Sequence, residues 1–301
     1  GVILMGQISL LIINGKNSGN EALRQAVYQQ RKEGNDIQVR VTWESSDIQR
    51  FVQEALHIQA QTIIAAGGDG TINNVASELV RLAPSSPPAL GIIPLGTAND
   101  FATSAQIPLE MDKALSLAIK GRAVPVDIIN VNKTHYFINM ASGGFGTKIT
   151  TETPEALKSA LGGAAYFING LLRIDTLKAD QCTVEAENFH WKGEALIIGI
   201  GNGRQAGGGQ QLCPEALIND NKLNITLVEA RELLPSLLTS LFDRKKNDKI
   251  IERESDWVTI SAAHEMVFNL DGEPLLGDKF EFIVLPEAIH CRLPPQCDLL
   301  S

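Results

Sequence analysis

The sequence predicts an α/β region followed by an all-β region: an N-terminal domain built on a parallel sheet, then a mainly antiparallel β domain. Two observations predict this order. Over the first 124 residues, short apolar runs alternate with amphipathic helical patterns, and repeated βα units form parallel sheets covered by helices on both faces. After Val124, short strand-like runs follow one another with few helical patterns between them, which is typical of antiparallel sheets.

The first half of the N-terminal domain contains two strand–helix pairs. Residues 10–13 form an apolar run of strand length, and residues 21–33 carry an apolar helical face that stops at Gly34, a C-cap signal. Residues 47–57 also repeat apolar side chains at helical spacing. Between the two helices, residues 37–43 alternate as in a half-buried strand, with apolar side chains at Ile37, Val39, Val41 and Trp43.

The second half repeats the pattern and adds two glycine loops. An apolar run at residues 61–66 leads through the first loop into a helical pattern at 72–82. After a proline-rich connection, a second apolar run at 89–93 leads through the second loop towards a helix at 111–120. Each loop therefore follows the C-terminal end of a strand, where ligands bind in parallel sheets.

The region after Val124 is predicted to be mainly strands, and we place the domain boundary there, with domains at 1–124 and 125–286. The helical patterns are confined to residues 154–177 and 233–242. The strand-like runs are residues 183–191, 194–200, 223–228, 257–261, 266–270 and 280–285.

Composition narrows the classes of function. A length of 301 residues suits two domains, and a net charge of −9 opposes broad binding to nucleic acid or to anionic lipid. No apolar stretch approaches the roughly 18 residues of a membrane span. The four cysteines are few and irregularly spaced, which favours reduced thiols and a cytoplasmic protein.

The first glycine loop has the chemistry of a phosphate site. It reads Gly67, Gly68, Asp69, Gly70 and Thr71, and the glycines would let backbone N–H groups and a helix N-terminus approach phosphate oxygens. It is neither a Walker A sequence nor a dinucleotide fingerprint. Asp69 would act through a cation or a water, or would cap the helix with Thr71. The alternative is a plain strand–helix turn with an N-cap.

The second loop places Thr97 ahead of Asn99 and Asp100 at a helix start. The hydroxyl and amide groups could bind a nucleotide phosphate or ribose. Capping would explain Asn99 or Asp100 equally well.

Two carboxylates at a strand end are candidate bases. Asp271 and Glu273 lie two residues apart, so on an extended chain both would face one cleft, where a carboxylate could deprotonate a hydroxyl attacking the γ-phosphorus of a nucleotide. Taken alone, Asp271 and Gly272 predict a hairpin turn. A nucleotide site elsewhere in the chain favours the interpretation that these carboxylates are candidate bases.

A third segment, residues 217–222, offers one carboxylate and several carbonyl groups after a glycine-rich loop. Oxygen-only ligands suit Mg²⁺ or Ca²⁺. An Asx-type turn before the next strand explains the segment equally well.

The sequences of these motifs resemble those of the diacylglycerol kinase-like lipid kinases, and in particular those of their bacterial YegS-type branch. The first loop is shared with phosphofructokinases and NAD kinases, whereas residues 94–102 (PLGTANDFA) are more specific. The similarity runs from about residue 10 to the C-terminus and includes residues 39–43, 137–141, 199–214, 268–274 and 291–295.

The resemblance implies a nucleotide-binding α/β domain completed by residues 287–301, a C-terminal β-sandwich and an active site in the cleft between them. It implies a kinase of phospholipid metabolism that uses ATP and Mg²⁺ on a lipid, with transient contact to the inner membrane face. Glu273 would be the base, with Asp271 as its rival. Leu217, Asp220 and Lys222 would hold Mg²⁺ or Ca²⁺. The residues implied to contact ATP are Thr42, Gly67, Gly68, Asp69, Gly70, Thr71, Ile72, Asn73, Asn74 and Thr97.

Two segments at the nucleotide edge depart from the family pattern, where Asn-Pro and Gly-Asp-Ala are common. Here they read Asn14-Gly15-Lys16 and Ser46-Asp47-Ile48. An apolar stripe within residues 157–177 could contact acyl chains or simply pack as a helix face. A soluble NAD or sugar-phosphate kinase, and a nucleotide-sensing protein without turnover, remain alternatives.

Overall fold

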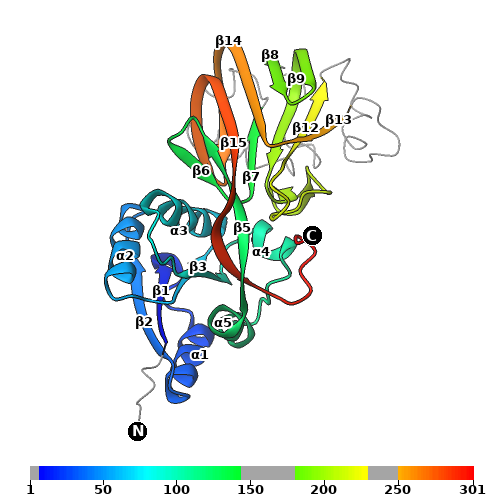
Figure 1. Cartoon of the computed structure of the whole chain (residues 1–301). Helices are drawn as coiled ribbons and strands as arrows, with labels where there is room; N and C mark the ends of the chain where they lie inside the picture. The colour runs from blue at the N-terminus through cyan, green and yellow to red at the C-terminus, as the bar shows by residue number, and fades with distance from the viewer. Residues whose placement is uncertain (1–6, 144–179, 230–249) are drawn as a thin grey trace. The chain divides into compact units, whose positions relative to one another are not determined.

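The computed structural model describes residues 7–143, 180–229 and 250–301, and it divides into two compact units (Figure 1). Unit 1 comprises Gly1–Val126 and Glu287–Asp298, and unit 2 comprises Asp127–Pro286 and Leu299–Ser301. The predicted helices at 154–177 and 233–242 and the acyl-contact stripe lie outside the described residues. None of the helices in the described residues is long and apolar enough to cross a membrane.

Unit 1 is a parallel sheet with helices between its strands. The strand order is β4-β3-β1-β2, and every neighbouring pair is parallel. The elements are β1 (Ile8–Asn14), α1 (Glu21–Lys32), β2 (Asp36–Thr42), α2 (Ser46–His57), β3 (Thr62–Gly67), α3 (Asp69–Leu82), β4 (Ala89–Pro94), α4 (Asp100–Ser104) and α5 (Met111–Lys120).

The strands β3 and β4 are buried along their whole length because helices cover the sheet and because β15 pairs in parallel with the other side of β4. On one face, alternate strand side chains such as Leu11 and Ile64 pack against apolar side chains of α1 and α5. The strand β2 lies at the edge (Figure 1). There the predicted apolar face fails: Val41 is 39% exposed, and Trp43 lies beyond the strand end and is 95% exposed.

Unit 2 is built from antiparallel pairs in the order β13-β12-β9-β7-β14-β15, with β8 pairing with both β14 and β9. Strands β5 and β15 each continue from one unit into the other. The strands are β5 (Arg122–Val131), β6 (His135–Phe137), β7 (Met140–Gly143), β8 (Asp180–Ala186), β9 (Phe189–Gly201), β10 (Gln205–Ala206), β11 (Gln210–Gln211), β12 (Leu223–Glu229), β13 (Ile250–Ser255), β14 (Trp257–Leu270) and β15 (Glu273–Leu293).

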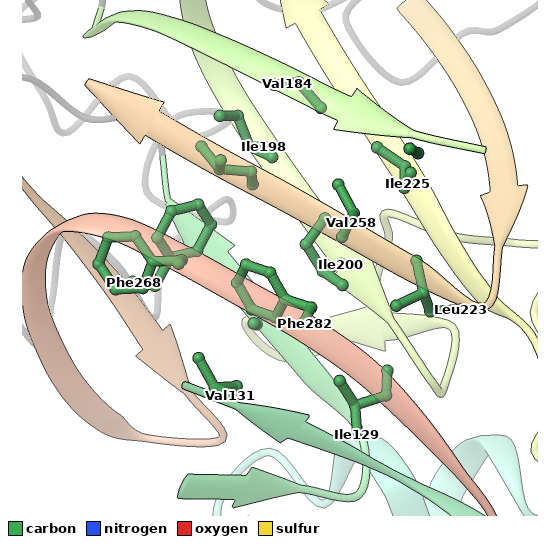
Figure 2. Close-up of a cluster of buried hydrophobic side chains, with 14 of the residues drawn as sticks. Ile129, Val131, Val184, Ile198, Ile200, Leu223, Ile225, Val258, Phe268 and Phe282 are labelled. Atoms are coloured by element: carbon green, nitrogen blue, oxygen red, sulfur yellow. The ribbon is translucent and has the colours of Figure 1, made fainter. Parts of the chain in front are cut away.

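The core of unit 2 is apolar and rich in phenylalanine (Figure 2). The Phe268 ring lies 4.7 Å from that of Phe280 and 5.5 Å from that of Phe282, between ring centroids. These side chains come from β14 and β15, whose antiparallel register brings alternate residues to the same face. The paired strands therefore support the turn that connects them.

Several strand boundaries in unit 2 differ from the expectation. The predicted strand at 183–191 is the end of β8, a turn and the start of β9, because Asn188 has a positive φ of 55° that reverses the chain. The runs at 257–261 and 266–270 are one strand, β14, with an irregular register between them. The long glycine-rich loop contains the short hairpin of β10 and β11.

The C-terminal segment is divided between the units, with Glu287–Asp298 in unit 1 and Leu299–Ser301 in unit 2. In unit 1, the Arg292 guanidinium donates to Thr62 Oγ1 at 2.9 and 3.0 Å and to Gly121 O at 2.7 Å. The last three residues belong to unit 2, because Ile218 N donates to Leu299 O at 2.8 Å.

All four cysteines lie within the described part of the chain, where they are buried and form no disulfide.

Candidate active site

The strand register aligns the C-terminal ends of the unit 1 sheet. Asn14 pairs with Thr42, and Gly67 pairs with Pro94. Ile13 of β1 pairs with Ala66, so the next residues along, Asn14 and Gly67, are also level. Both glycine loops and the end of β2 therefore begin from one row at the same edge of the sheet.

The two glycine loops touch each other through their backbones. Leu95 N donates to Gly67 O at 2.9 Å. A Cβ added to Gly96 would come closer than 3.0 Å to Gly68 Cα, and one added to Gly68 would lie 3.2 Å from Gly96 Cα. A Cβ on Gly67 would lie 2.6 Å from Thr71 Oγ1. The glycines are needed for this close approach whether or not a ligand is bound.

The Asp69 side chain of the first loop is hydrogen-bonded to the helix that follows the second loop. Helix α3 begins at Asp69, three residues before the predicted start, with Gly68 as its N-cap. The Asp69 carboxylate accepts hydrogen bonds from the N–H groups of Asp100 at 2.9 Å and Phe101 at 3.0 Å. Asp69 thus caps α4 rather than its own helix. Burial raises the pKa of its carboxyl group.

The second loop is closed by Asn99. Its Oδ1 accepts from Gly96 N and its Nδ2 donates to Gly96 O, both at 2.8 Å, with Asn99 at a positive φ of 53°. Asn99 occupies the N-cap position of α4, but its side chain makes no capping hydrogen bond to that helix, in contrast to the capping role that the sequence allowed. Thr97 lies exposed at the tip of the closed loop.

The remaining candidate nucleotide residues have different accessibility. Thr71, Ile72 and Asn73 are buried, whereas Gly70 and Asn74 are half-buried. Ile72 N donates to Gly68 O at 3.1 Å, so the helical ladder of α3 starts there. The N–H groups of the first turn have no intrahelical acceptor and are the ones that a phosphate could use.

The two departures from the family pattern lie near Thr42, which is buried at the end of β2. Asn14-Gly15-Lys16 leads into the short 3₁₀ helix Gly15–Asn17, and Ser46-Asp47-Ile48 begins α2. A Cβ on Gly15 would lie 2.6 Å from Thr42 O, so the chain after β1 runs close against the end of β2. Asp47 Oδ2 accepts from Trp43 N at 2.8 Å and Glu44 N at 3.2 Å, and these hydrogen bonds lower the pKa of Asp47.

In unit 2 the structure separates the two candidate bases. Asp271 and Gly272 have positive φ values of 49° and 104° and form the turn between β14 and β15, so the extended-chain argument does not apply. The buried Asp271 carboxylate accepts from three consecutive N–H groups, those of Ile138, Asn139 and Met140, at 3.2, 2.9 and 2.9 Å. Glu273 is exposed at the first position of β15.

Sequence reasoning missed the buried polar residues behind this turn. Asn202 Nδ2 donates to Asp127 O at 2.8 Å and to Ile138 O at 2.7 Å. The Asp127 carboxylate in turn accepts from Asn221 N at 2.8 Å. A polar residue within an apolar strand, as Asp127 is in β5, was the signal available.

The candidate metal segment forms the Asx-type turn that the sequence allowed, since Asp220 Oδ1 accepts from Lys222 N at 3.0 Å. Burial raises the pKa of Asp220, and the nearby carboxylates of Asp127 and Glu254 raise it further. A cation would relieve this repulsion, and carboxylate and carbonyl oxygens are the ligand types that Mg²⁺ and Ca²⁺ take. Within residues 7–143, 180–229 and 250–301, no three His, Cys, Asp or Glu side chains gather as a metal site.

Comparison with known proteins identifies relatives over nearly the whole chain. Residues 9–131 match the diacylglycerol kinase catalytic domain family, and residues 140–292 match the YegS C-terminal NAD kinase beta sandwich-like domain family. The chain is 61% identical, over 97% of its length, to proteins named "Probable lipid kinase YegS-like" from Yersinia enterocolitica and Serratia proteamaculans, covering 99% and 96% of them. A crystal structure described as a diacylglycerol kinase from Bacillus anthracis shares the fold, with a TM-score of 0.75 at 22% identity over 97% of this chain and 98% of that one.

Proposed function

The chain belongs to the YegS-like lipid kinases of the diacylglycerol kinase family, and from that premise we propose that it transfers the γ-phosphate of Mg-ATP to the hydroxyl group of a membrane lipid. Phosphatidylglycerol and diacylglycerol are the two candidate acceptors. The enzyme would be cytoplasmic and would contact the inner membrane face only while acting on lipid. The observation that carries the proposal is the pair of glycine loops held together by Asp69.

The nucleotide is assigned to unit 1. The backbone N–H groups in the first turn of α3 and the glycines of both loops would bind its phosphates, because helix N-termini and bare backbone favour anions. The exposed Thr97 hydroxyl would add a side-chain donor at the tip of the second loop. Asp69 contributes by holding the loops in place, since its carboxylate already accepts two backbone hydrogen bonds.

Glu273 is assigned as the general base. Its exposed carboxylate can take the proton of the lipid hydroxyl as that oxygen attacks the γ-phosphorus and ADP leaves. Asp271 is a poorer candidate, because its oxygens already accept three backbone N–H groups. Asp271 is therefore proposed as a positioning residue for the turn that carries Glu273.

The oxygen donors of residues 217–222 are assigned to Mg²⁺, with Ca²⁺ as the alternative. The Leu217 and Lys222 carbonyl groups and the Asp220 carboxylate would be the ligands. A bound cation would neutralise the acidic surroundings of Asp220 and fix the loop. Mg²⁺ should raise the melting temperature of the wild-type protein, and Asp220→Asn should abolish that rise while folding normally.

The experiment that tests the main proposal is transfer of labelled γ-phosphate from Mg-ATP to phosphatidylglycerol and diacylglycerol in mixed micelles. Glu273→Gln is assayed beside Glu265→Gln, a matched change of an exposed glutamate on β14. We expect one lipid to be labelled by the wild type and by Glu265→Gln, and not by Glu273→Gln. Equal labelling by all three proteins would remove Glu273 from the mechanism.

The same assay includes NAD and fructose 6-phosphate. NAD is included because the C-terminal domain belongs to a family described as NAD kinase beta sandwich-like. Label in either soluble acceptor, with none in lipid, would contradict the lipid kinase proposal. ATP binding without transfer to any acceptor would favour the nucleotide sensor.

A further inference from the structure

Trp43 is the most exposed large hydrophobic residue in the described part of the chain. Its side chain is 95% exposed, against 63% for the next, Leu109. A tryptophan carries a large apolar ring that is normally buried against a partner. The exposed ring therefore needs an explanation from its surroundings.

A hydrogen bond holds the backbone of Trp43 in place, although its ring is exposed to solvent. Its N–H donates to Asp47 Oδ2 at 2.8 Å, and the same oxygen accepts from Glu44 N at 3.2 Å. Asp47 is in turn paired with Arg50 at 3.1 Å. The ring is thus presented to solvent from an anchored turn. Binding of a ligand over the ring would therefore cost little conformational entropy in the backbone.

Trp43 lies at the same edge of the sheet as the two glycine loops. It follows Thr42, which is level with Asn14, and the row continues through Gly67 to Pro94. Strands in a sheet lie about 4.8 Å apart, so the end of β2 is roughly 10 Å from the end of β3, two strands away. This is the order of distance between the phosphates and the base of an extended nucleotide.

Strand β1 lies between the ends of β2 and β3. β1 ends at Asn14 and is followed by Gly15, which carries no side chain and runs close against Thr42 O. The Asn14 side chain is turned to its own loop, where Oδ1 accepts from Lys16 N at 3.0 Å. A nucleotide with its phosphates at the glycine loops could therefore extend along this edge to the Trp43 ring.

We propose that Trp43 is the residue on which the base of the donor nucleotide stacks, an inference that rests on the proposed nucleotide site of unit 1. The chemistry recognised is the π-face of a nucleobase, which every nucleoside triphosphate offers and inorganic tripolyphosphate lacks. An anionic bilayer is the less suitable partner, because the exposed Glu44, which follows Trp43, and the Asp47 carboxylate, which accepts from Trp43 N, would repel its headgroups.

The test compares the binding of Mg-ATP and of Mg-tripolyphosphate by calorimetry. Trp43→Ala and Trp43→Phe are measured beside Trp257→Ala, a matched change of a 38% exposed tryptophan in unit 2. We expect Trp43→Ala to weaken ATP binding roughly 5- to 150-fold and to leave tripolyphosphate binding unchanged. Trp43→Phe should restore most of the loss, and Trp257→Ala should behave as the wild type.

Each other outcome overturns the inference in a recognisable way. Equal weakening of ATP and tripolyphosphate would mean that the substitution damages the loops. Unchanged ATP affinity would leave the ring without a role at the base. If Trp43→Ala also reduced binding to phosphatidylglycerol vesicles, the ring would be assigned to the membrane instead. A wild-type protein that binds neither ligand would overturn the proposed nucleotide site itself.

Discussion

Replacing Gly96 by alanine tests whether the contact between the two glycine loops is essential. The added Cβ would come closer than 3.0 Å to Gly68 Cα and would lie 3.0 Å from Asn99 Oδ1, so the second loop must move away from the first. Forcing an extra carbon into a packed site costs about 1–3 kcal/mol. The φ of Gly96 is not in the left-handed region, so the clash alone carries the effect.

Two other glycines give a graded series. A Cβ on Gly68 would lie 3.2 Å from Gly96 Cα, and one on Gly19, also in unit 1, would meet nothing within 4 Å. Gly19→Ala should leave the free energy of unfolding unchanged or raise it by up to about 1 kcal/mol, because alanine restricts the unfolded chain. Gly68→Ala should fall between Gly19→Ala and Gly96→Ala.

Urea unfolding measures the stability of each variant, and labelled phosphate transfer measures its rate. A displacement of about 1 Å at a reacting group can lower the rate about 100-fold, so we expect a loss of that order in Gly96→Ala. Wild-type stability together with a wild-type rate in Gly96→Ala would refute the reasoning that the loops must touch. A loss in Gly19→Ala equal to that in Gly96→Ala would refute it as well.

Three further predictions follow from hydrogen bonding and burial. Asp271→Asn should lower the free energy of unfolding by roughly 1.5–3 kcal/mol, because three backbone N–H groups lose a charged acceptor, whereas Glu273→Gln should change it by less than about 0.5 kcal/mol. Urea titration of both variants checks this, and equal losses would contradict it. Burial raises the pKa of Cys291 to about 12, so this thiol should not react with iodoacetamide in the native protein. In urea the same thiol should be modified, and mass spectrometry would detect the difference. The lowered pKa of Asp47 means that its contribution to stability is present above about pH 4 and is lost as the pH falls through the lowered value. The stability difference between the wild type and Asp47→Ala should therefore be constant near neutral pH and should vanish on acidification; a difference that persists in acid would show that the carboxylate charge is not its source.

Local patterns allowed the elements of unit 1 to be predicted well, because each helix and strand there has its own periodicity. The helices at 21–33, 47–57 and 111–120 begin and end within about one residue of the prediction. Where packing on one side is missing, periodicity misleads. Val41 and Trp43 share the apolar alternation of Ile37 and Val39, yet they lie at the open end of an edge strand and are exposed.

The sequence by itself determined which residues are candidates: the glycine loops, the carboxylates at the end of β14 and the oxygen donors at 217–222. Tertiary structure decided what those residues do to one another. Asp69 accepts hydrogen bonds from residues 31 and 32 positions away, and Asp271 from residues more than 130 positions away. Periodicity and turn chemistry describe neighbours along the chain, whereas these hydrogen bonds join segments that only folding brings together. They distinguish the half-buried Asp69 and the buried Asp271, whose carboxylates accept backbone hydrogen bonds, from the exposed Glu273.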